Sequence, residues 1–156
     1  MNTLTIGKKA PAFTLPAHDG TTVKLSALKG QTVVLYFYPR DNTPGCTTES
    51  ADFASQHKAF TKAGAVILGV SQDSLKSHDK FATKLSLPFQ LLSDEDGDMC
   101  RAYDVIKLKK MYGKEFEGIE RSTFLIDEAG KLQQAWRKVK VPGHVDEVLA
   151  AVKALG

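Results

Sequence analysis

One stretch of the chain decides the fold: Val33-Val34-Leu35-Tyr36-Phe37-Tyr38-Pro39-Arg40-Asp41-Asn42-Thr43-Pro44-Gly45-Cys46. Residues 33–38 are apolar and rich in β-branched and aromatic side chains, which predicts a strand buried on both faces, as in a parallel sheet. Pro39 ends the strand because it has no N–H to donate to a neighbouring strand. A helix is expected from Pro44, a residue suited to the first helical position, with Thr43 as its N-cap. The stretch therefore predicts a strand, a short loop and a helix with a cysteine in its first turn.

Cys46 is expected at the third position of this helix, where unpaired backbone N–H groups and the positive end of the helix dipole favour an anion. For cysteine that anion is the thiolate, which is the reactive form. Gly45 lets another group approach the backbone closely, because it has no side chain. The alternative is a small buried apolar residue, as most free cysteines are. A structural cysteine requires no cap, proline stop or neighbouring glycine, so we favour a reactive Cys46.

The rest of the chain alternates strands and helices. Strands are predicted at residues 21–25, 65–70, 89–92, 122–126 and 132–139, and helices at 26–30, 44–63, 74–85, 97–103 and 145–155. The stretch 106–118 carries four lysines and has no clear period, so it is predicted to be a loop. This order predicts an α/β fold with helices on both faces of the sheet, and a C-terminal hairpin and helix after a βαβ unit is the thioredoxin arrangement.

Length and composition are those of an ordinary globular chain. The 156 residues predict one domain, residues 1–156, with its own core. The net charge of +3 is too small to indicate nucleic-acid or membrane-surface binding, and no apolar run is long enough to span a bilayer. The N-terminus shows no signal-peptide pattern, and the two cysteines form no C-x-x-C pair. We therefore expect a cytoplasmic protein in a reducing compartment, with no nucleic-acid or membrane partner.

A metal site is not expected. None of the histidines has metal-ligand spacing to a cysteine or to another histidine: His18, His57, His78 and His144. The acidic run 94–98 resembles the start of a calcium loop, which requires glycine at its sixth position and glutamate at its twelfth. Met99 and Val105 occupy those positions here. Acidic residues at the start of a helix are the simpler interpretation.

The central stretch also resembles a known family. Pro39-x-x-x-Thr43-x-x-Cys46 resembles the active-site motif of peroxiredoxins, the cysteine peroxidases, and its continuation to Glu49 resembles the peroxiredoxin Q or bacterioferritin comigratory protein subfamily. Three more segments resemble that subfamily: residues 94–97, 121–127 and 136–140. These separated motifs fall in the right order over nearly the whole chain. The resemblance implies a thioredoxin-like fold with a central mixed sheet and helices on both faces.

The resemblance further implies a catalytic set of four residues. Cys46 would attack the peroxide. Thr43, the backbone N–H of Cys46 and Arg121 would together hold the O–O bond in line and stabilise charge on the departing oxygen, and Pro39 would shield the thiolate from water. From the residues alone, Arg121 is predicted to be an ordinary surface charge at the start of a strand, and only the resemblance reverses this prediction.

Substrate-binding positions are implied at Glu49, Tyr38 and Gly45. Glu49 follows Cys46 by one helical turn and matches an active-site position of the subfamily. Its alternative is an ordinary glutamate on the helix surface, and the residues alone do not separate the two.

The implied activity is that of a thioredoxin-dependent peroxiredoxin, a thiol peroxidase serving antioxidant defence. Cys46 would reduce hydrogen peroxide and organic hydroperoxides and become a sulfenic acid. No metal, haem, flavin or other cofactor is implied. An alternative is a thioredoxin-fold redox sensor or chaperone that uses Cys46 oxidation as a signal, and a weaker one is a binding module with an inert cysteine.

Recycling of Cys46 is where the chain departs from its relatives. Positions at which subfamily members carry a second, resolving cysteine hold Ala51 and Ala82. Cys100 is the only other thiol; its apolar neighbours predict a buried, inert side chain, although local unfolding could still pair it with Cys46. We therefore expect a monomer with a one-cysteine cycle, in which thioredoxin, glutaredoxin or glutathione reduces the sulfenic acid directly.

Overall fold

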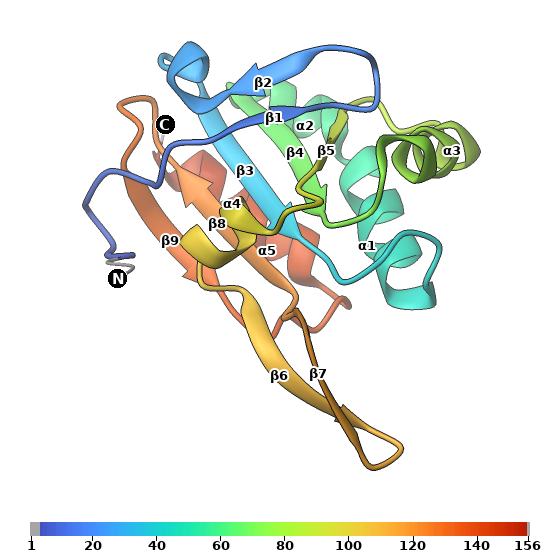
Figure 1. Ribbon diagram of the computed structural model, residues 1–156. Helices are drawn as coiled ribbons and strands as arrows, with labels where there is room; N and C mark the ends of the chain where they lie inside the picture. The colour runs from blue at the N-terminus through green and yellow to red at the C-terminus, as the bar shows by residue number, and fades with distance from the viewer. Residues whose placement is uncertain (1–3, 156) are drawn as a thin grey trace.

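A five-stranded mixed sheet forms the centre of the molecule (Figure 1). The computed structural model describes residues 4–155. The strands, in the order in which they lie side by side, are β5 (Gln90–Ser93), β4 (Ala65–Ser71), β3 (Thr32–Phe37), β8 (Ser122–Ile126) and β9 (Leu132–Trp136). β3 is the predicted buried strand, and all its residues are buried. It pairs in parallel with β4 but antiparallel with β8, so the sheet is mixed, as expected.

The two faces of the sheet are covered differently. Four helices lie on one face: α1 (Pro44–Ser55), α2 (His57–Lys62), α3 (Leu75–Leu85) and α5 (His144–Leu155). The other face is covered by the short helix α4 (Asp98–Ala102), the hairpin of β1 (Thr14–Pro16) and β2 (Thr22–Lys24), and the single turn η1 (Leu25–Leu28). The expected helices are therefore present on both faces, although most lie on one. Among the described residues, no helix is long and apolar enough to cross a membrane.

Successive residues of β3 point to opposite faces and so enter two separate cores. Tyr36 lies beneath α1 and stacks on Phe53, with ring centroids 4.6 Å apart. Phe37 faces the other way and packs on Tyr103, at 5.4 Å. The two cores are thus separated by the sheet itself.

The single helix predicted over residues 44–63 is wrong, because the chain leaves helical geometry at Gln56 (φ −101°, ψ 6°). Two helices, α1 and α2, take its place. The turn allows Phe60 of α2 to pack against Phe53 of α1, with ring centroids 5.8 Å apart. The predicted end at Gly64 is confirmed, since this residue has a positive φ of 82°.

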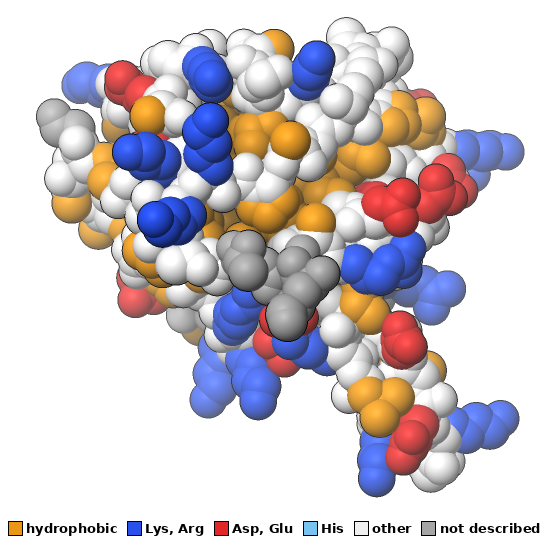
Figure 2. Space-filling model, turned by 60° about the vertical axis from the view of Figure 1, so that its left-hand side comes forward, with side chains coloured by type: hydrophobic (Ala, Val, Ile, Leu, Met, Phe, Trp, Pro, Cys, Tyr) orange, Lys and Arg blue, Asp and Glu red, His pale blue; other side chains and the backbone are white. Residues whose placement is uncertain are grey.

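The loop predicted over residues 106–118 is also wrong. It is a hairpin of β6 (Ile106–Met111) and β7 (Lys114–Ile119), closed by a two-residue turn in which Tyr112 and Gly113 both have positive φ. Figure 1 shows it projecting from the sheet, and Figure 2 shows charged side chains along it. Because the hairpin projects from the sheet (Figure 1), Leu108 (64% exposed) and Phe116 (42%) stay exposed, and the usual alternation of buried and exposed residues is weak.

Candidate active site

The pairing of β3 with β8 brings together residues that are far apart in sequence. Phe37, the last residue of β3, lies opposite Ser122, the first residue of β8. Arg121 immediately precedes Ser122, and the loop after Phe37 leads directly into α1. The arginine therefore lies at the edge of the sheet where α1 begins and Cys46 is placed.

Arg121 contacts both candidate residues of the first turns of α1. Its Nη2 donates to Cys46 Sγ at 3.3 Å, and its Nη1 donates to Glu49 Oε1 at 2.6 Å. Cys46 and Glu49 are fully buried, while the Arg121 side chain is 15% exposed. Two simpler interpretations are therefore excluded: Arg121 is not an isolated surface charge, and Glu49 does not lie on the helix surface. The guanidinium places a positive charge and a hydrogen-bond donor beside the sulfur.

Gly45 allows the arginine to approach this closely. A Cβ atom at this position would lie 3.0 Å from Arg121 Nη2 and 3.7 Å from its Cζ. The group that the glycine was expected to admit is thus the guanidinium. A side chain here would push Arg121 away from the sulfur.

The ionisable side chains around Arg121 are buried, and their partners only partly offset the cost of that burial. Burial raises the pKa of Glu49 to about 7, although the charge of Arg121 and its hydrogen bond oppose this. Glu49 Oε2 is buried and has no hydrogen-bond partner among the described residues. Lys109 of β6 bonds to the carbonyl of Ile119; burial and the charge of Arg121 lower the pKa of this lysine. A second cationic side chain, Lys109, thus lies near Arg121, and the pKa of the Glu49 carboxyl lies close to neutral pH.

Thr43 occupies the N-cap position of α1, as predicted, and Pro44 is the first helical residue. The predicted capping bond is wrong, because the Thr43 side chain makes no capping hydrogen bond to α1. The Thr43 hydroxyl instead donates to the carbonyl of Arg40, at 2.9 Å. The hydrogen of the hydroxyl is therefore used within the loop, and the oxygen keeps its lone pairs for another donor.

The other two residues expected in the site lie in the loop before α1. Pro39 is half-buried and directly follows β3. Tyr38 is fully buried, and its hydroxyl donates to Asp41 Oδ1 at 2.7 Å. The structure thus places the polar end of Tyr38 on the loop, not on Cys46.

Cys100 is buried on α4, as predicted. It belongs to the core on the face of the sheet opposite to that of Cys46, and both cysteines are free. Burial, together with hydrogen bonding to Asp94, raises the pKa of the Cys100 thiol, so the thiolate needed for disulfide exchange is disfavoured. Pairing with Cys46 would require one of the two segments to leave its core.

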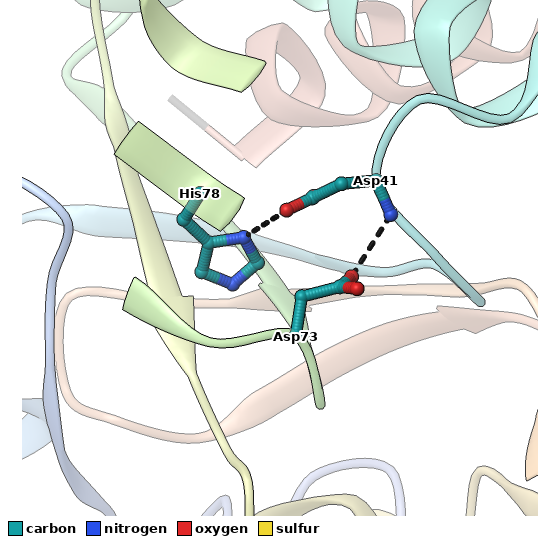
Figure 3. A group of neighbouring side chains, drawn as sticks. All are labelled: Asp41, Asp73 and His78. Carbon is teal, nitrogen blue, oxygen red and sulfur yellow. Dashed lines mark hydrogen bonds and ion pairs between the residues drawn. The ribbon is translucent and has the colours of Figure 1, made fainter. Parts of the chain in front are cut away.

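Three polar residues near the site were missed in the sequence: Asp41, Asp73 and His78 (Figure 3). Asp41 follows β3, Asp73 follows the parallel neighbour β4, and His78 lies on α3. The available signal was the pair of aspartates after two apolar runs, since adjacent parallel strands end at the same edge of a sheet. His78 had no such signal, because only the packing of α3 brings it to them.

The fold and site define a class of protein: a thioredoxin-fold redox protein with a buried cysteine at a helix N-terminus, paired with an arginine. Comparisons with known proteins agree. A sequence model described as the AhpC/TSA family matches residues 6–135. Peroxiredoxin Bcp of Bacillus subtilis (strain 168) is 56% identical over 151 residues, which cover 97% of this chain and 96% of that protein. Peroxiredoxin Bcp of Xanthomonas campestris is 58% identical over 147 residues, covering 93% and 92%.

A solved structure of the Xanthomonas campestris bacterioferritin comigratory protein is also similar, with a TM-score of 0.91 and 54% identity over 97% of this chain and 99% of that one. The chain belongs to the AhpC/TSA family and is a peroxiredoxin, a thiol peroxidase. The family and the thioredoxin-like fold predicted from the sequence are thereby confirmed. An enzyme is favoured over the sensor and binding-module alternatives.

Proposed function

We propose that Cys46 is the peroxidatic cysteine of this chain and that its substrates are hydrogen peroxide and organic hydroperoxides. The observation that carries the proposal is the pair of bonds from Arg121 to Cys46 Sγ and to Glu49 Oε1. The similar bacterioferritin comigratory protein of Xanthomonas campestris is described as having alkyl peroxide reduction activity. This supports organic hydroperoxides as substrates here.

In the proposed reaction the Cys46 thiolate attacks one oxygen of the peroxide. The S–O bond forms as the O–O bond breaks, and the departing oxygen takes a proton and leaves as water or an alcohol, so that Cys46 becomes a sulfenic acid. Arg121 stabilises the negative charge that moves from sulfur to the departing oxygen. The Thr43 oxygen accepts a hydrogen bond from the peroxide, and the backbone N–H of Cys46, in the first turn of α1, donates one.

The substrate is proposed to approach along Arg121. Its side chain is 15% exposed and Thr43 and Gly45 are part-buried, whereas Cys46 is fully buried, so the guanidinium is one of the groups through which the site meets solvent. Half-buried Pro39 limits access of water to the sulfur from the loop side. A surface hollow of about 650 Å³ is lined by Phe13, Asp94 and Met99, which belong to the other side of the sheet. We assign that hollow no part in the reaction.

An external thiol is proposed to regenerate Cys46. Ala51 is exposed and Ala82 is buried on α3, so neither position offers a sulfur, and Cys100 lies behind the sheet. The thiol of thioredoxin, glutaredoxin or glutathione attacks the sulfenic sulfur and releases water, and a second thiol then reduces the mixed disulfide.

We further propose that the protein is a monomer of the cytoplasm, where its two free cysteines stay reduced. Sedimentation of the purified protein tests the monomer.

The test is peroxide turnover coupled to NADPH, thioredoxin reductase and thioredoxin, with Cys46→Ser and Cys100→Ser as a matched pair. We expect Cys46→Ser to abolish turnover with its fold intact, because serine is nearly isosteric but a far poorer nucleophile at neutral pH. Cys100→Ser should turn over like the wild type. Turnover by Cys46→Ser would disprove the peroxidatic role, and stoichiometric consumption by the wild type would indicate a sensor.

A further inference from the structure

The peptide unit between Arg40 and Asp41 is held at both ends. Its C=O accepts the Thr43 hydroxyl at 2.9 Å, and its N–H donates to Asp73 Oδ2 at 2.9 Å. Because these two groups belong to one planar unit, a rotation that moves one moves the other. Asp73 therefore limits the directions in which the Thr43 hydroxyl can point.

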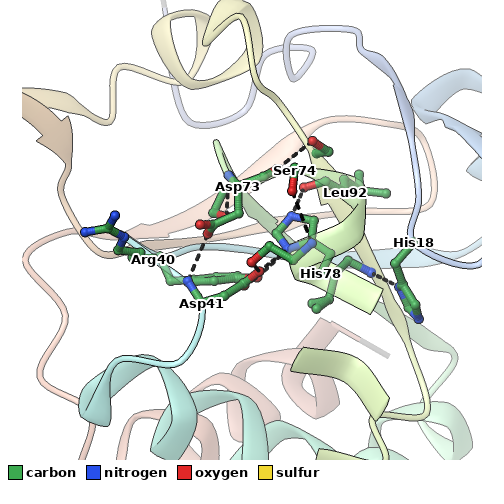
Figure 4. Close-up of polar contacts among 12 residues, drawn as sticks. His18, Arg40, Asp41, Asp73, Ser74, His78 and Leu92 are labelled. Atoms are coloured by element: carbon green, nitrogen blue, oxygen red, sulfur yellow. Dashed lines mark hydrogen bonds and ion pairs between the residues drawn. The ribbon is translucent and has the colours of Figure 1, made fainter. Parts of the chain in front are cut away.

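The side chain of Asp41 is held as firmly as its backbone. Oδ1 accepts from the Tyr38 hydroxyl at 2.7 Å, while Oδ2 accepts from the Ser77 hydroxyl and faces His78 Nδ1, both at 2.8 Å. Figure 4 shows Asp41 from the loop after β3, His78 from α3 and Asp73 from the loop after β4 lying close together, while the Arg40 side chain points away. The next residue, Asn42, has a positive φ of 63°, a conformation that persists when surrounding contacts enforce it.

Both ring nitrogens of His78 have a hydrogen-bond partner. Nε2 lies 2.9 Å from the carbonyl of Leu92, which can only accept, so Nε2 carries a proton. Burial alone would raise the pKa of Asp41, but hydrogen bonding to His78 and the charge of His78 hold it below its ordinary value. The carboxylate of Asp41 lies 2.8 Å from Nδ1 through its Oδ2. This fully buried pair thus ties α3 and β5 to the loop before Cys46.

A bound cation is a poorer use of the same residues. One ligand atom each of Asp41, Asp73 and His78 lies within 4.8 Å of the others. Those carboxylate atoms already accept protein donors, however: Asp73 Oδ2 accepts from the Ser71 hydroxyl as well as from Asp41 N. A metal would have to displace these bonds.

We propose that Asp73, Asp41 and His78 are positioning residues that orient the Thr43 hydroxyl for the peroxide reaction. The proposal rests on the role of Thr43 in the proposed function. Asp73 acts on one end of the Arg40–Asp41 peptide unit, and the pair of Asp41 with His78 fixes the same unit through the Asp41 side chain.

The test is a double-mutant cycle on the rate constant of reduced protein with hydrogen peroxide, followed by stopped-flow fluorescence. Asp73→Ala should slow the reaction by between about tenfold and 100-fold, since a misplacement of about 1 Å can cost about 100-fold. Asp73→Asn should restore most of the rate, because its amide oxygen can accept from Asp41 N. In a Thr43→Val background, Asp73→Ala should change the rate by less than about twofold, since the hydroxyl it orients is already gone.

Ser74→Ala is the matched control. The Ser74 hydroxyl caps α3 by accepting from Ser77 N, so its loss should destabilise the same segment, but this hydroxyl does not contact the Arg40–Asp41 peptide unit. Its rate should equal that of the wild type. Multiplicative effects of Asp73→Ala and Thr43→Val would overturn the proposal. An unchanged rate for Thr43→Val alone would show that the role of Thr43 is wrong, and the positioning role would fall with it.

Discussion

Replacement of Glu49 by glutamine should change how the stability of the protein depends on pH. Burial raises the pKa of Glu49 from an ordinary value of 4.5 to about 7. Between these values the unfolded chain has lost the proton and the folded protein still holds it, so folding becomes less favourable as pH rises. The shift of about 2.5 pH units corresponds to about 3 kcal/mol at 1.36 kcal/mol per unit. This contribution is fully present below pH 4.5 and is lost by about pH 7.

The stability of Glu49→Gln must be compared with that of the wild type at each pH, because His144 changes the stability of both proteins in the opposite direction over nearly the same pH range. Burial lowers the pKa of His144 from 6.5 to about 4, so its contribution to stability rises with pH. The free energy of unfolding should therefore be measured in urea for the wild type and Glu49→Gln, from pH 4.5 to 8. Glutamine can still accept from Arg121, but it cannot ionise.

The stability of Glu49→Gln relative to the wild type should increase by up to about 3 kcal/mol between pH 4.5 and 7. Glu128→Gln, which changes an exposed glutamate, is the control and should follow the wild-type curve at every pH. Parallel curves for the wild type and Glu49→Gln would refute the raised pKa of this buried carboxyl.

Three further predictions concern the sulfur and its surroundings. Arg121→Ala should slow the reaction with peroxide by about 100-fold or more and also slow alkylation of Cys46 by iodoacetamide at pH 7; an unchanged alkylation rate would separate Arg121 from the thiolate. Gly45→Ala should slow the peroxide reaction, because its Cβ would lie 3.0 Å from Arg121 Nη2. The melting temperature should stay equal or rise, because alanine favours a helix over glycine by up to about 1 kcal/mol. A wild-type rate would show that the position of Arg121 does not depend on the space beside Gly45. Reduced protein given one equivalent of peroxide should gain one oxygen atom by intact mass and react with dimedone; loss of two hydrogens that Cys100→Ser abolishes would identify Cys100 as the resolving residue.

Much of the site could be predicted from the sequence because its signals are local. The apolar run before Pro39 indicates a buried strand, and Thr43, Pro44 and Gly45 indicate a helix that starts at Pro44, two residues before Cys46, whatever lies around them. The family motifs added Arg121, which residue types alone indicate to be an ordinary surface charge, and Glu49, for which residue types alone left both interpretations open. Order and type of most elements followed from the same local patterns.

Only the tertiary structure decided which groups meet and which way they point. Antiparallel pairing of β8 with β3 carries Arg121 to a cysteine 75 residues away, and desolvation beneath the α1 helix makes Glu49 a carboxyl that titrates near neutral pH. The Thr43 hydroxyl had two acceptable uses, a cap or a bond to Arg40, and the held peptide unit selected the second. Backbone sterics and the hydrophobic pattern set local preferences within the sequence itself, whereas long-range pairing and burial decide the partners of each polar group.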